Sequence, residues 1–412
     1  MSLPVNEIRD RFPALRRHVN DRPVVYFDGP SGAQVPGTVA EAMRSYLLTT
    51  NANALGAFVT SRETEAIYDE ARRAAADFTG SDPGEIAFGA NMTTLSYALT
   101  RAVGRTLKPG DEIITTELEH EGNVSPWLQI AKDFGLAVRT VPLRREDATL
   151  DMDAYAALLG DRTRVVAFTL ASNAFGSKTD VRRITGLAHE AGALAWGDAV
   201  HFAPHERIDR RAFGLDVLLC SPYKFFGPHL GLAAIDRELA TTLPADRVRP
   251  AAENPPGHRF ETGTQPHEAI AGFVAAVDYL AGLGKGPDRR RRLDDAYARI
   301  GAHERELSAH ALRRMASIKG LKVYGITDPD RAGERTPTFS FTLPHRSPAQ
   351  VAEQLGEQGI FTSAGNLYAF NASLAYGREE AGGWTRAGFL HYTTRSEVDR
   401  FCDAITEIAG HP

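Results

Sequence analysis

The stretch LAWGDAVHFAPHERIDRRAFGLDVLLCSPYKFFGPHLG, residues 194–231, decides the fold because it contains two apolar runs that are each followed by a charged side chain. Asp198 follows ALAWG, and Lys224 follows DVLLCSPY. If both runs are buried parallel strands, their carboxyl ends meet at one edge of a sheet, and one pocket holds both charges. The aromatic residues Tyr223, Phe225 and Phe226 flank the lysine. They would partly desolvate its amine, which lowers the pKa of a lysine and favours the free base.

A free amine beside a carboxylate predicts a lysine that forms a Schiff base with an aldehyde. A pyridoxal 5'-phosphate (PLP) enzyme needs such a lysine, and it needs a carboxylate at the pyridinium nitrogen to keep the ring a strong electron sink. Asp198 is the candidate for that carboxylate. On this stretch alone, a surface lysine and an aspartate that caps a helix explain the two charges equally well.

Composition indicates a large globular protein without a nucleic-acid or membrane partner. The 412 residues, 43% of them hydrophobic, suffice for two or more domains. The net charge of -5 gives no basic excess for nucleic acid or anionic lipid. Neither a membrane-spanning run nor a signal pattern occurs in the sequence, so we expect a cytoplasmic protein. The two cysteines and thirteen histidines form no metal-binding pattern, so we expect no metal.

Strand-like and helix-like segments alternate through the first two thirds of the chain. Helices are expected near residues 124–134, 151–159 and 181–190, each after an apolar run. This alternation predicts an α/β fold with a mainly parallel sheet between helices. Polar residues follow the runs, and they should converge where open α/β sheets bind ligands. They are His120, Asn173, Asp198 with His201, and Ser221 with Lys224. Taken singly, each also fits an ordinary structural role.

A helix start near Asn91 is the candidate phosphate site. Met92, Thr93 and Thr94 would supply free backbone N–H groups and hydroxyls in the first turn. An ordinary Asn/Thr helix cap explains the same residues equally well. The chain has no GxGxxG after a strand, which argues against a dinucleotide-binding fold.

Later segments predict a second, smaller unit. A charged stretch from 287 to 315 is typical of a long helix that joins two domains, and an α+β pattern follows it. We therefore expect an N-terminal arm over residues 1–30 that packs with the small domain, a large domain over 31–285 and a small domain over 286–412. Arg386 lies on a short apolar strand of that small domain. Its guanidinium suits the carboxylate of an amino acid, although a surface ion pair explains it too.

Eight motifs, in order, carry a resemblance that covers almost the whole chain. They are DGPSGAQVP, GANMTTL, ELEHEGNV, ASNAFG, GDAVH, CSPYKFFGPHLG, RFETGT and GFLHYTTRSEVDRF. Together they resemble the class V aminotransferase family of fold-type I PLP enzymes, close to its cysteine desulfurase-like branch. The resemblance implies PLP as cofactor, an amino-acid substrate, and a large PLP-binding domain with a smaller α+β C-terminal domain.

The same resemblance implies roles for individual residues. Lys224 would bind PLP and move the Cα proton, Asp198 would pair with the ring nitrogen, and His120 would stack on the ring. Further cofactor contacts would come from Met92, Thr93, Asn173, His201, Ser221, Tyr223 and Thr264. Thr264 would reach across from a second subunit, which implies a homodimer with shared sites. Arg386 would bind the substrate carboxylate, with Asn53 and Gln34 nearby. Most desulfurases have glutamine and histidine where this chain has His201 and Tyr223, so the contacts at these two positions stay open.

The sequence departs from a desulfurase where sulfur chemistry would require a thiol. A desulfurase needs a nucleophilic cysteine on a mobile loop before the carboxylate-binding arginine. Residues 361–386, FTSAGNLYAFNASLAYGREEAGGWTR, carry Asn366, Tyr368 and Tyr376 but no cysteine. Cys220 lies within an apolar run and Cys402 within an amphipathic helix, so both are predicted to be structural.

Three functions remain open from the sequence. β-Elimination, such as Cβ–S cleavage without a protein persulfide, needs only Lys224 and a good leaving group, and we favour it. Transamination or epimerisation uses the same lysine to protonate a different carbon or face. A non-catalytic PLP-fold partner protein is the contrasting class. It would not need Lys224, Asp198, His120 and Arg386 together.

Overall fold

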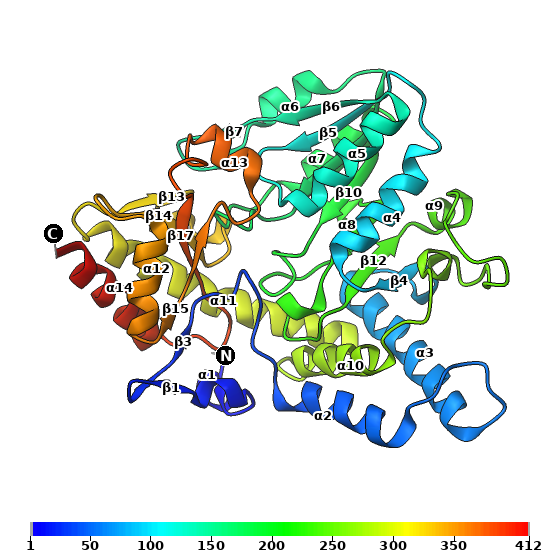
Figure 1. The fold of residues 1–412 in the computed structure, drawn as a ribbon, viewed down its shortest axis with the longest axis horizontal. Helices are drawn as coiled ribbons and strands as arrows, with labels where there is room; N and C mark the ends of the chain where they lie inside the picture. The colour runs from blue at the N-terminus through cyan, green and yellow to red at the C-terminus, as the bar shows by residue number, and fades with distance from the viewer. Residues whose placement is uncertain (1–2, 411–412) are drawn as a thin grey trace.

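The larger part of the molecule is built on a seven-stranded sheet (Figure 1), in a computed structural model that describes residues 3–410. In spatial order the strands are β4 (Ile86–Gly89), β12 (Gly231–Ile235), β11 (Val217–Cys220), β10 (Leu194–Asp198), β9 (Thr163–Thr169), β5 (Glu112–Thr116) and β6 (Ala137–Val141). Neighbouring strands are parallel except at β12, which is antiparallel to both β11 and β4. The sheet confirms the predicted mainly parallel α/β fold.

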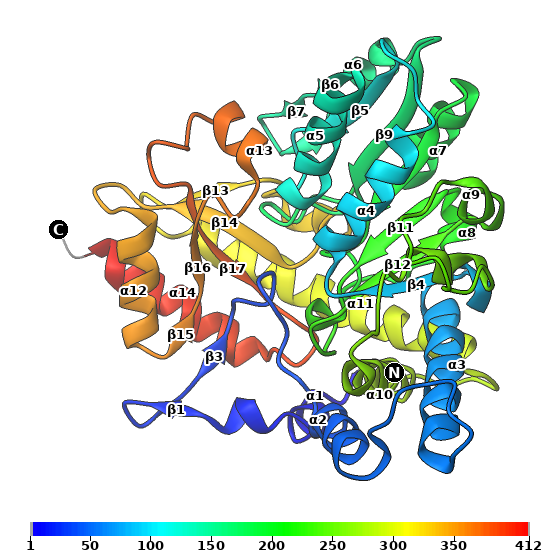
Figure 2. The same cartoon turned by 45° about the vertical axis from the view of Figure 1, so that its right-hand side comes forward.

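Helices cover both faces of this sheet because its strands are apolar on both sides. In β10, Trp196 packs in a cluster with Leu99 and Trp127 on one face, whereas Ala195 packs with Phe78 and Ile184 on the other. The first face carries α4 (Met92–Gly104), α5 (Ser125–Phe134) and α9 (Arg237–Thr242). Figure 2 shows α4 and α5 side by side over the strands.

The opposite face carries a larger set of helices. They are α3 (Val59–Thr79), α6 (Met152–Leu158), α7 (Val181–Glu190), α8 (Arg210–Phe213), α10 (His267–Ala281) and the first part of α11 (Arg289–Ala316), and α2 (Gly37–Ser45) packs on α10. No helix between residues 3 and 410 is both long enough and apolar enough to cross a bilayer.

A second, antiparallel sheet organises the C-terminal part of the chain, drawn in yellow to red in Figure 1. Its order is β13 (Lys322–Tyr324), β14 (Thr338–Thr342), β17 (Trp384–Gly388) and β16 (Ser363–Gly365). Helices α12 (Pro348–Glu357) and α14 (Arg395–Gly410) pack against it. Helix α11 joins the two cores, since Leu293 and Ile300 belong to the larger one and Leu307 and Met315 to the smaller. This confirms the predicted long connecting helix.

The N-terminal segment contacts both cores. Ile8 and Phe12 pack in the larger core, whereas Val25 and Phe27 pack in the smaller one. Strand β3 (Val25–Tyr26) pairs in parallel with β15 (Ile360–Phe361). Other short elements include α1 (Val5–Arg9), α13 (Phe370–Ala375) and the hairpins β1/β2 (His18–Val19, Arg22–Pro23) and β7/β8 (Leu143–Arg144, Thr149–Leu150). The division at residues 30 and 285 stays a prediction.

A buried ion pair connects the edge strand β4 of the large sheet to helix α3. Arg72 of α3 donates from Nη2 to both carboxylate oxygens of Glu261, at 2.9 and 3.0 Å, and from Nη1 to the carbonyl of Ile86 at 2.7 Å. The backbone N–H of Phe88 donates to Glu261 Oε1 at 3.0 Å. Each ion-pair residue is only 7% exposed. Because the pair is desolvated, loss of one partner leaves an uncompensated charge.

Glu261→Ala should therefore destabilise the protein strongly. The unpaired Arg72 guanidinium should lower the free energy of unfolding by about 3–5 kcal/mol, measured by urea denaturation. Glu41→Ala is the matched control, because Glu41 pairs with Arg44 where both side chains are more than half exposed. It should change the urea midpoint little. Equal midpoints for the two variants would show that the buried pair does not stabilise the fold.

Candidate active site

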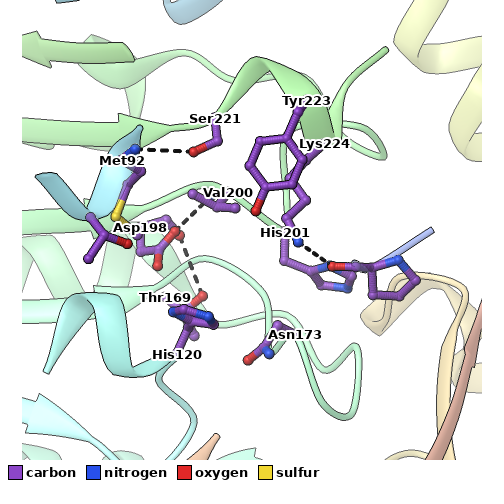
Figure 3. A pocket seen from close by; sticks show the side chains of 12 residues that line it. Met92, His120, Thr169, Asn173, Asp198, Val200, His201, Ser221, Tyr223 and Lys224 are labelled. Carbon is purple, nitrogen blue, oxygen red and sulfur yellow. Dashed lines mark hydrogen bonds between the residues drawn. The ribbon is translucent and has the colours of Figure 1, made fainter. Parts of the chain in front are cut away.

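A pocket lies where the carboxyl ends of β9, β10 and β11 meet the start of α4 (Figure 3). It contains about 460 Å³ of space not filled by protein atoms, part of it open to solvent. The lining residues are Pro30, Met92, Thr93, His120, Thr169, Asn173, Asp198, Val200, His201, Ser221, Tyr223 and Lys224. Nine of the ten residues predicted to contact a cofactor are therefore gathered in one pocket.

Asp198 is a buried carboxylate without a cationic partner. It is the last residue of β10, it is 2% exposed, and it accepts a hydrogen bond from the Val200 backbone N–H at 2.8 Å. Burial raises its pKa to about 6, against the effects of this N–H and of Lys224. Within residues 3–410 no Lys, Arg or His side chain forms an ion pair with it. A protonated ring nitrogen would supply the missing charge, so Asp198 fits the predicted cofactor.

Lys224 lies across the pocket from Asp198 (Figure 3). It belongs to a helical turn, Pro222–Lys224, just after β11, and the next residue, Phe225, is fully buried. Its Nζ donates hydrogen bonds to the backbone carbonyls of Pro30 at 2.5 Å and Ser31 at 3.1 Å. Burial, helped by the charge of Arg386, lowers its pKa to about 7. A substantial fraction of Lys224 is therefore a free amine at neutral pH.

His120 presents a neutral imidazole to the pocket. Its Nδ1 accepts a hydrogen bond from the Gly122 backbone N–H at 2.9 Å, and its ring stacks on Tyr368 with centroids 5.4 Å apart. Burial, helped by the charges of Lys224 and Arg386, lowers the pKa of His120 to about 4. Its flat, uncharged ring suits stacking on an aromatic ligand.

The start of α4, Met92 and Thr93, lines the pocket, and the helix begins where the sequence predicted a helix start. Asn91 caps this helix, because its Oδ1 accepts hydrogen bonds from the backbone N–H of Thr94 at 2.8 Å and from the Thr94 hydroxyl at 3.0 Å. The backbone N–H of Met92 donates to Ser221 Oγ at 3.3 Å. Thr93, in the first turn, lines the pocket beside Ser221. A helix start combined with hydroxyls is a suitable site for a phosphate.

Arg386 is a buried cation next to the pocket wall. It lies in β17, is 4% exposed, and donates from Nη1 to the Asn173 carbonyl at 2.7 Å and from Nη2 to Ser31 Oγ at 2.8 Å. Burial lowers its pKa to about 10, which leaves it charged at neutral pH. No carboxylate of the described chain pairs with it, and both its Nε and Asn173 Oδ1 lack a partner there. A substrate carboxylate would compensate this charge.

The two positions at which the chain departs from most desulfurases also lie in the pocket. His201 Nε2 lies 3.1 Å from the Thr336 hydroxyl and 3.0 Å from the Thr338 hydroxyl. Burial lowers the pKa of His201 well below its usual value, so the imidazole is neutral. Tyr223 stacks on His229, with ring centroids 5.1 Å apart.

Besides Thr94 and Arg386, which lies next to the pocket wall, three predicted residues do not line this pocket. Asn53 and Thr264 are exposed on connecting segments, and the Gln34 backbone N–H donates to the Tyr392 hydroxyl at 3.3 Å. Their roles stay predictions, and that of Thr264 requires a second subunit. Sequence reasoning missed three lining residues, Thr169, Val200 and Pro30. The strand-end rule could have found Thr169, the last residue of β9, whereas Pro30 takes part through its backbone carbonyl and has no side-chain signal.

Both cysteines are buried and are poor nucleophiles in this structure. Each is 0% exposed. Burial raises the pKa of Cys220 far above its usual value and raises that of Cys402 to about 12. Within the range 3–410, no three His, Cys, Asp or Glu side chains converge as metal ligands.

The lowered pKa of Lys224 can be measured without any cofactor. We expect the rate at which acetic anhydride acetylates Lys224 in the apoprotein to be half-maximal near pH 7, because burial favours the free amine. Asp198→Asn should move this curve to lower pH, because it removes a charge that stabilises the ammonium form. Peptide mass spectrometry gives the rate, with the exposed Lys132 as internal reference. A midpoint near the ordinary lysine value of about 10.4 would contradict this account.

Comparison with known proteins places the chain in a family. The model of the aminotransferase class-V family matches residues 25–401. A probable cysteine desulfurase of Streptomyces coelicolor is 31% identical over 98% of this chain and 97% of its own length, and an aminotransferase-like protein of Gibberella zeae is 30% identical over 98% of each. Apo cysteine desulfurase from Thermococcus onnurineus superposes with a TM-score of 0.87 at 25% identity, covering 99% of this chain and 98% of that one. The chain belongs to the aminotransferase class-V family of PLP-dependent enzymes and is cysteine desulfurase-like over almost its whole length.

Proposed function

We propose that this protein uses PLP to cleave a bond at Cβ of an L-α-amino acid by β-elimination, with a carbon–sulfur bond as the favoured target. One observation carries the proposal. A buried carboxylate, Asp198, and an amine of lowered pKa, Lys224, face each other across a pocket that lies next to the unpaired Arg386. The residues present fit PLP, because Asp198 lacks the cation that a protonated ring nitrogen would provide.

PLP, when bound, supplies an aldehyde for a lysine amine and a ring that takes up the electron pair released at Cα. Asp198 would hold a proton at the ring nitrogen. Met92, Thr93 and Ser221 would hold the phosphate at the start of α4, and His120 would stack on the ring. Each of these residues lines the pocket, which supports these roles.

Arg386 and Lys224 would handle the substrate. Arg386 would bind the α-carboxylate and so orient the Cα–H bond relative to the cofactor ring. The free amine of Lys224 would take the proton from Cα and deliver it to the leaving group as the bond at Cβ breaks. This elimination is redox-neutral: the Cα–H and Cβ–S bonds break, the proton leaves with the thiol, and water hydrolyses the remaining fragment to pyruvate and ammonia. The buried cysteines support a reaction in which sulfur leaves as a free thiol rather than on the protein.

Two observations bear on the alternatives. The relatives from Streptomyces coelicolor and Yersinia pestis are named for cysteine desulfuration, which favours chemistry at sulfur. The Gibberella zeae relative is named aminotransferase-like, so transamination is the second candidate, with epimerisation close to it. A non-catalytic partner protein is disfavoured, because a scaffold needs neither the Lys224 amine nor the Asp198 carboxylate.

We further propose a homodimer with shared active sites. Thr264 lies exposed on the connection before α10 and outside the pocket of its own chain. It would complete the phosphate site of a second subunit. Asn53, which is also exposed, would approach the substrate site from the loop before α3.

The products distinguish these reactions. Incubation of the PLP-loaded protein with cysteine and its S-substituted derivatives should release pyruvate and a thiol or sulfide in equal amounts. Lys224→Ala should abolish the visible Schiff-base absorption and lower turnover by at least about a thousandfold, since it removes the acid/base group. Accumulation of pyridoxamine phosphate would instead indicate transamination. A protein that binds no PLP under any condition would refute the proposal.

The cysteines provide an independent check. Cys220→Ala and Cys402→Ala should each leave turnover unchanged within about twofold, because neither thiol reaches the pocket or ionises at neutral pH. Circular dichroism and thermal melting would verify that each variant folds. Loss of activity in a folded variant would mean that the sulfur atom passes through that thiol after all.

A further inference from the structure

A buried carboxyl group outside the pocket supports the turn from which His120 reaches the cofactor site. Glu119, the residue before His120, is only 1% exposed. Its Oε1 accepts hydrogen bonds from the Thr116 hydroxyl at 2.6 Å and from the Thr169 backbone N–H at 2.9 Å. Its Oε2 accepts a third from Asn123 Nδ2 at 2.7 Å. Because Thr116 and Thr169 are the last residues of β5 and β9, this side chain connects two strand ends to the turn.

The bond between Glu119 and Asn123 closes the turn that carries His120. The turn consists of Glu121–Asn123, and His120 caps its start. Asn123 is fixed at its other end as well, because its Oδ1 accepts a hydrogen bond at 3.0 Å from Nε1 of Trp196, a fully buried residue of β10. Rotation of the Asn123 amide would therefore break both bonds. The turn, and the imidazole that it carries, are held in place relative to the large sheet.

The hydrogen bonds around Glu119 require an acid rather than an amide. All three partners donate, and of the three groups only the Thr116 hydroxyl can also accept. Burial raises the pKa of Glu119 to about 8, against these hydrogen bonds, and the Thr116 hydroxyl can accept from the acid when it is protonated. A glutamine would place its NH₂ group against either Asn123 Nδ2 or the Thr169 N–H, neither of which accepts. A shift of the turn would relieve this conflict.

We propose that Glu119 is a positioning residue that fixes the His120 imidazole where it stacks on the cofactor ring. The inference rests on the proposed function for this stacking. Glu119 does not line the pocket, so it would act on the cofactor through His120. A shifted turn would have to return to its place when PLP binds. Positioning therefore makes the affinity for PLP depend on Glu119, whereas a purely structural role would change stability and leave the affinity unchanged.

Titration of the apoprotein with PLP, followed by the Schiff-base absorption, measures this dependence. Glu119→Gln should raise the dissociation constant about tenfold, a usual effect of one unsatisfied buried donor. In a His120→Ala background it should have little further effect, because the group that it positions is gone. Glu121→Gln is the matched control and should change nothing. Glu121 lies in the same turn and accepts from the Ser125 hydroxyl at 2.6 Å, which a glutamine oxygen can also do.

A second measurement needs no cofactor. Diethyl pyrocarbonate modifies neutral imidazole, and burial lowers the pKa of His120 to about 4, so at pH 7 the rate reports exposure rather than charge. Glu119→Gln should speed modification of His120, measured by peptide mass spectrometry with the exposed His18 as internal reference. Thr116→Val removes one donor and keeps the acid, and it should act in the same direction more weakly. It serves if Glu119→Gln fails to fold, which circular dichroism would reveal.

Three results would overturn the proposal. They are an unchanged affinity for PLP in every folded variant, an equal loss of affinity with and without His120, and an unchanged rate of His120 modification in the folded variants. A wild-type protein that binds no PLP would instead refute the proposed function. The modification of His120 in the apoprotein would then still decide whether Glu119 holds this residue in place, so the two failures can be told apart.

Discussion

The site depends on the burial of two opposite charges at the ends of adjacent strands. Strands β10 and β11 are parallel, with Asp198 paired in register with Leu219, so the carboxylate and the turn that carries Lys224 emerge at the same edge of the sheet. Burial opposes ionisation of both groups, raising the pKa of Asp198 and lowering that of Lys224. The sheet thus holds the Asp198 carboxylate, which has no ion-pair partner, and the Lys224 amine in the same pocket. A cofactor that carries both a protonated nitrogen and an aldehyde satisfies both groups at once.

Much of this arrangement could be predicted from the sequence, because local patterns determine it. The apolar runs around Trp196 and Leu218 indicated buried parallel strands, and the polar residues at their ends were expected to converge. The cap at Asn91 similarly indicated where α4 starts. These signals lie within a few residues of the feature that they predict. The same holds for the cysteines, whose apolar neighbours indicated their burial.

Contacts between distant segments could not be predicted in this way. Lys224 meets the Pro30 carbonyl across 194 residues of chain, and a backbone carbonyl is present at every position, so the sequence does not mark it. The stacking of Tyr368 on His120 depends on how the small sheet docks against the large one. The antiparallel direction of β12 is also invisible in its composition, since an apolar strand buried on both faces looks the same in either direction.

Residues 366–368 belong to the segment in which a desulfurase would carry its nucleophilic cysteine, and this chain has no cysteine there. Leu367 and Tyr368 both have left-handed backbone conformations, with φ of 62° and 57°, which cost non-glycine residues of order 1 kcal/mol or more each. Hydrogen bonds to the walls of the site compensate this cost. Asn173 Nδ2 donates to the Leu367 carbonyl, and the Glu121 backbone N–H donates to the Tyr368 carbonyl, each at 2.8 Å. A loop that carried sulfur away from the substrate would have to break these contacts in every turnover. A loop that stays in place can keep them, which supports the proposed reaction in which the sulfur leaves as a free thiol.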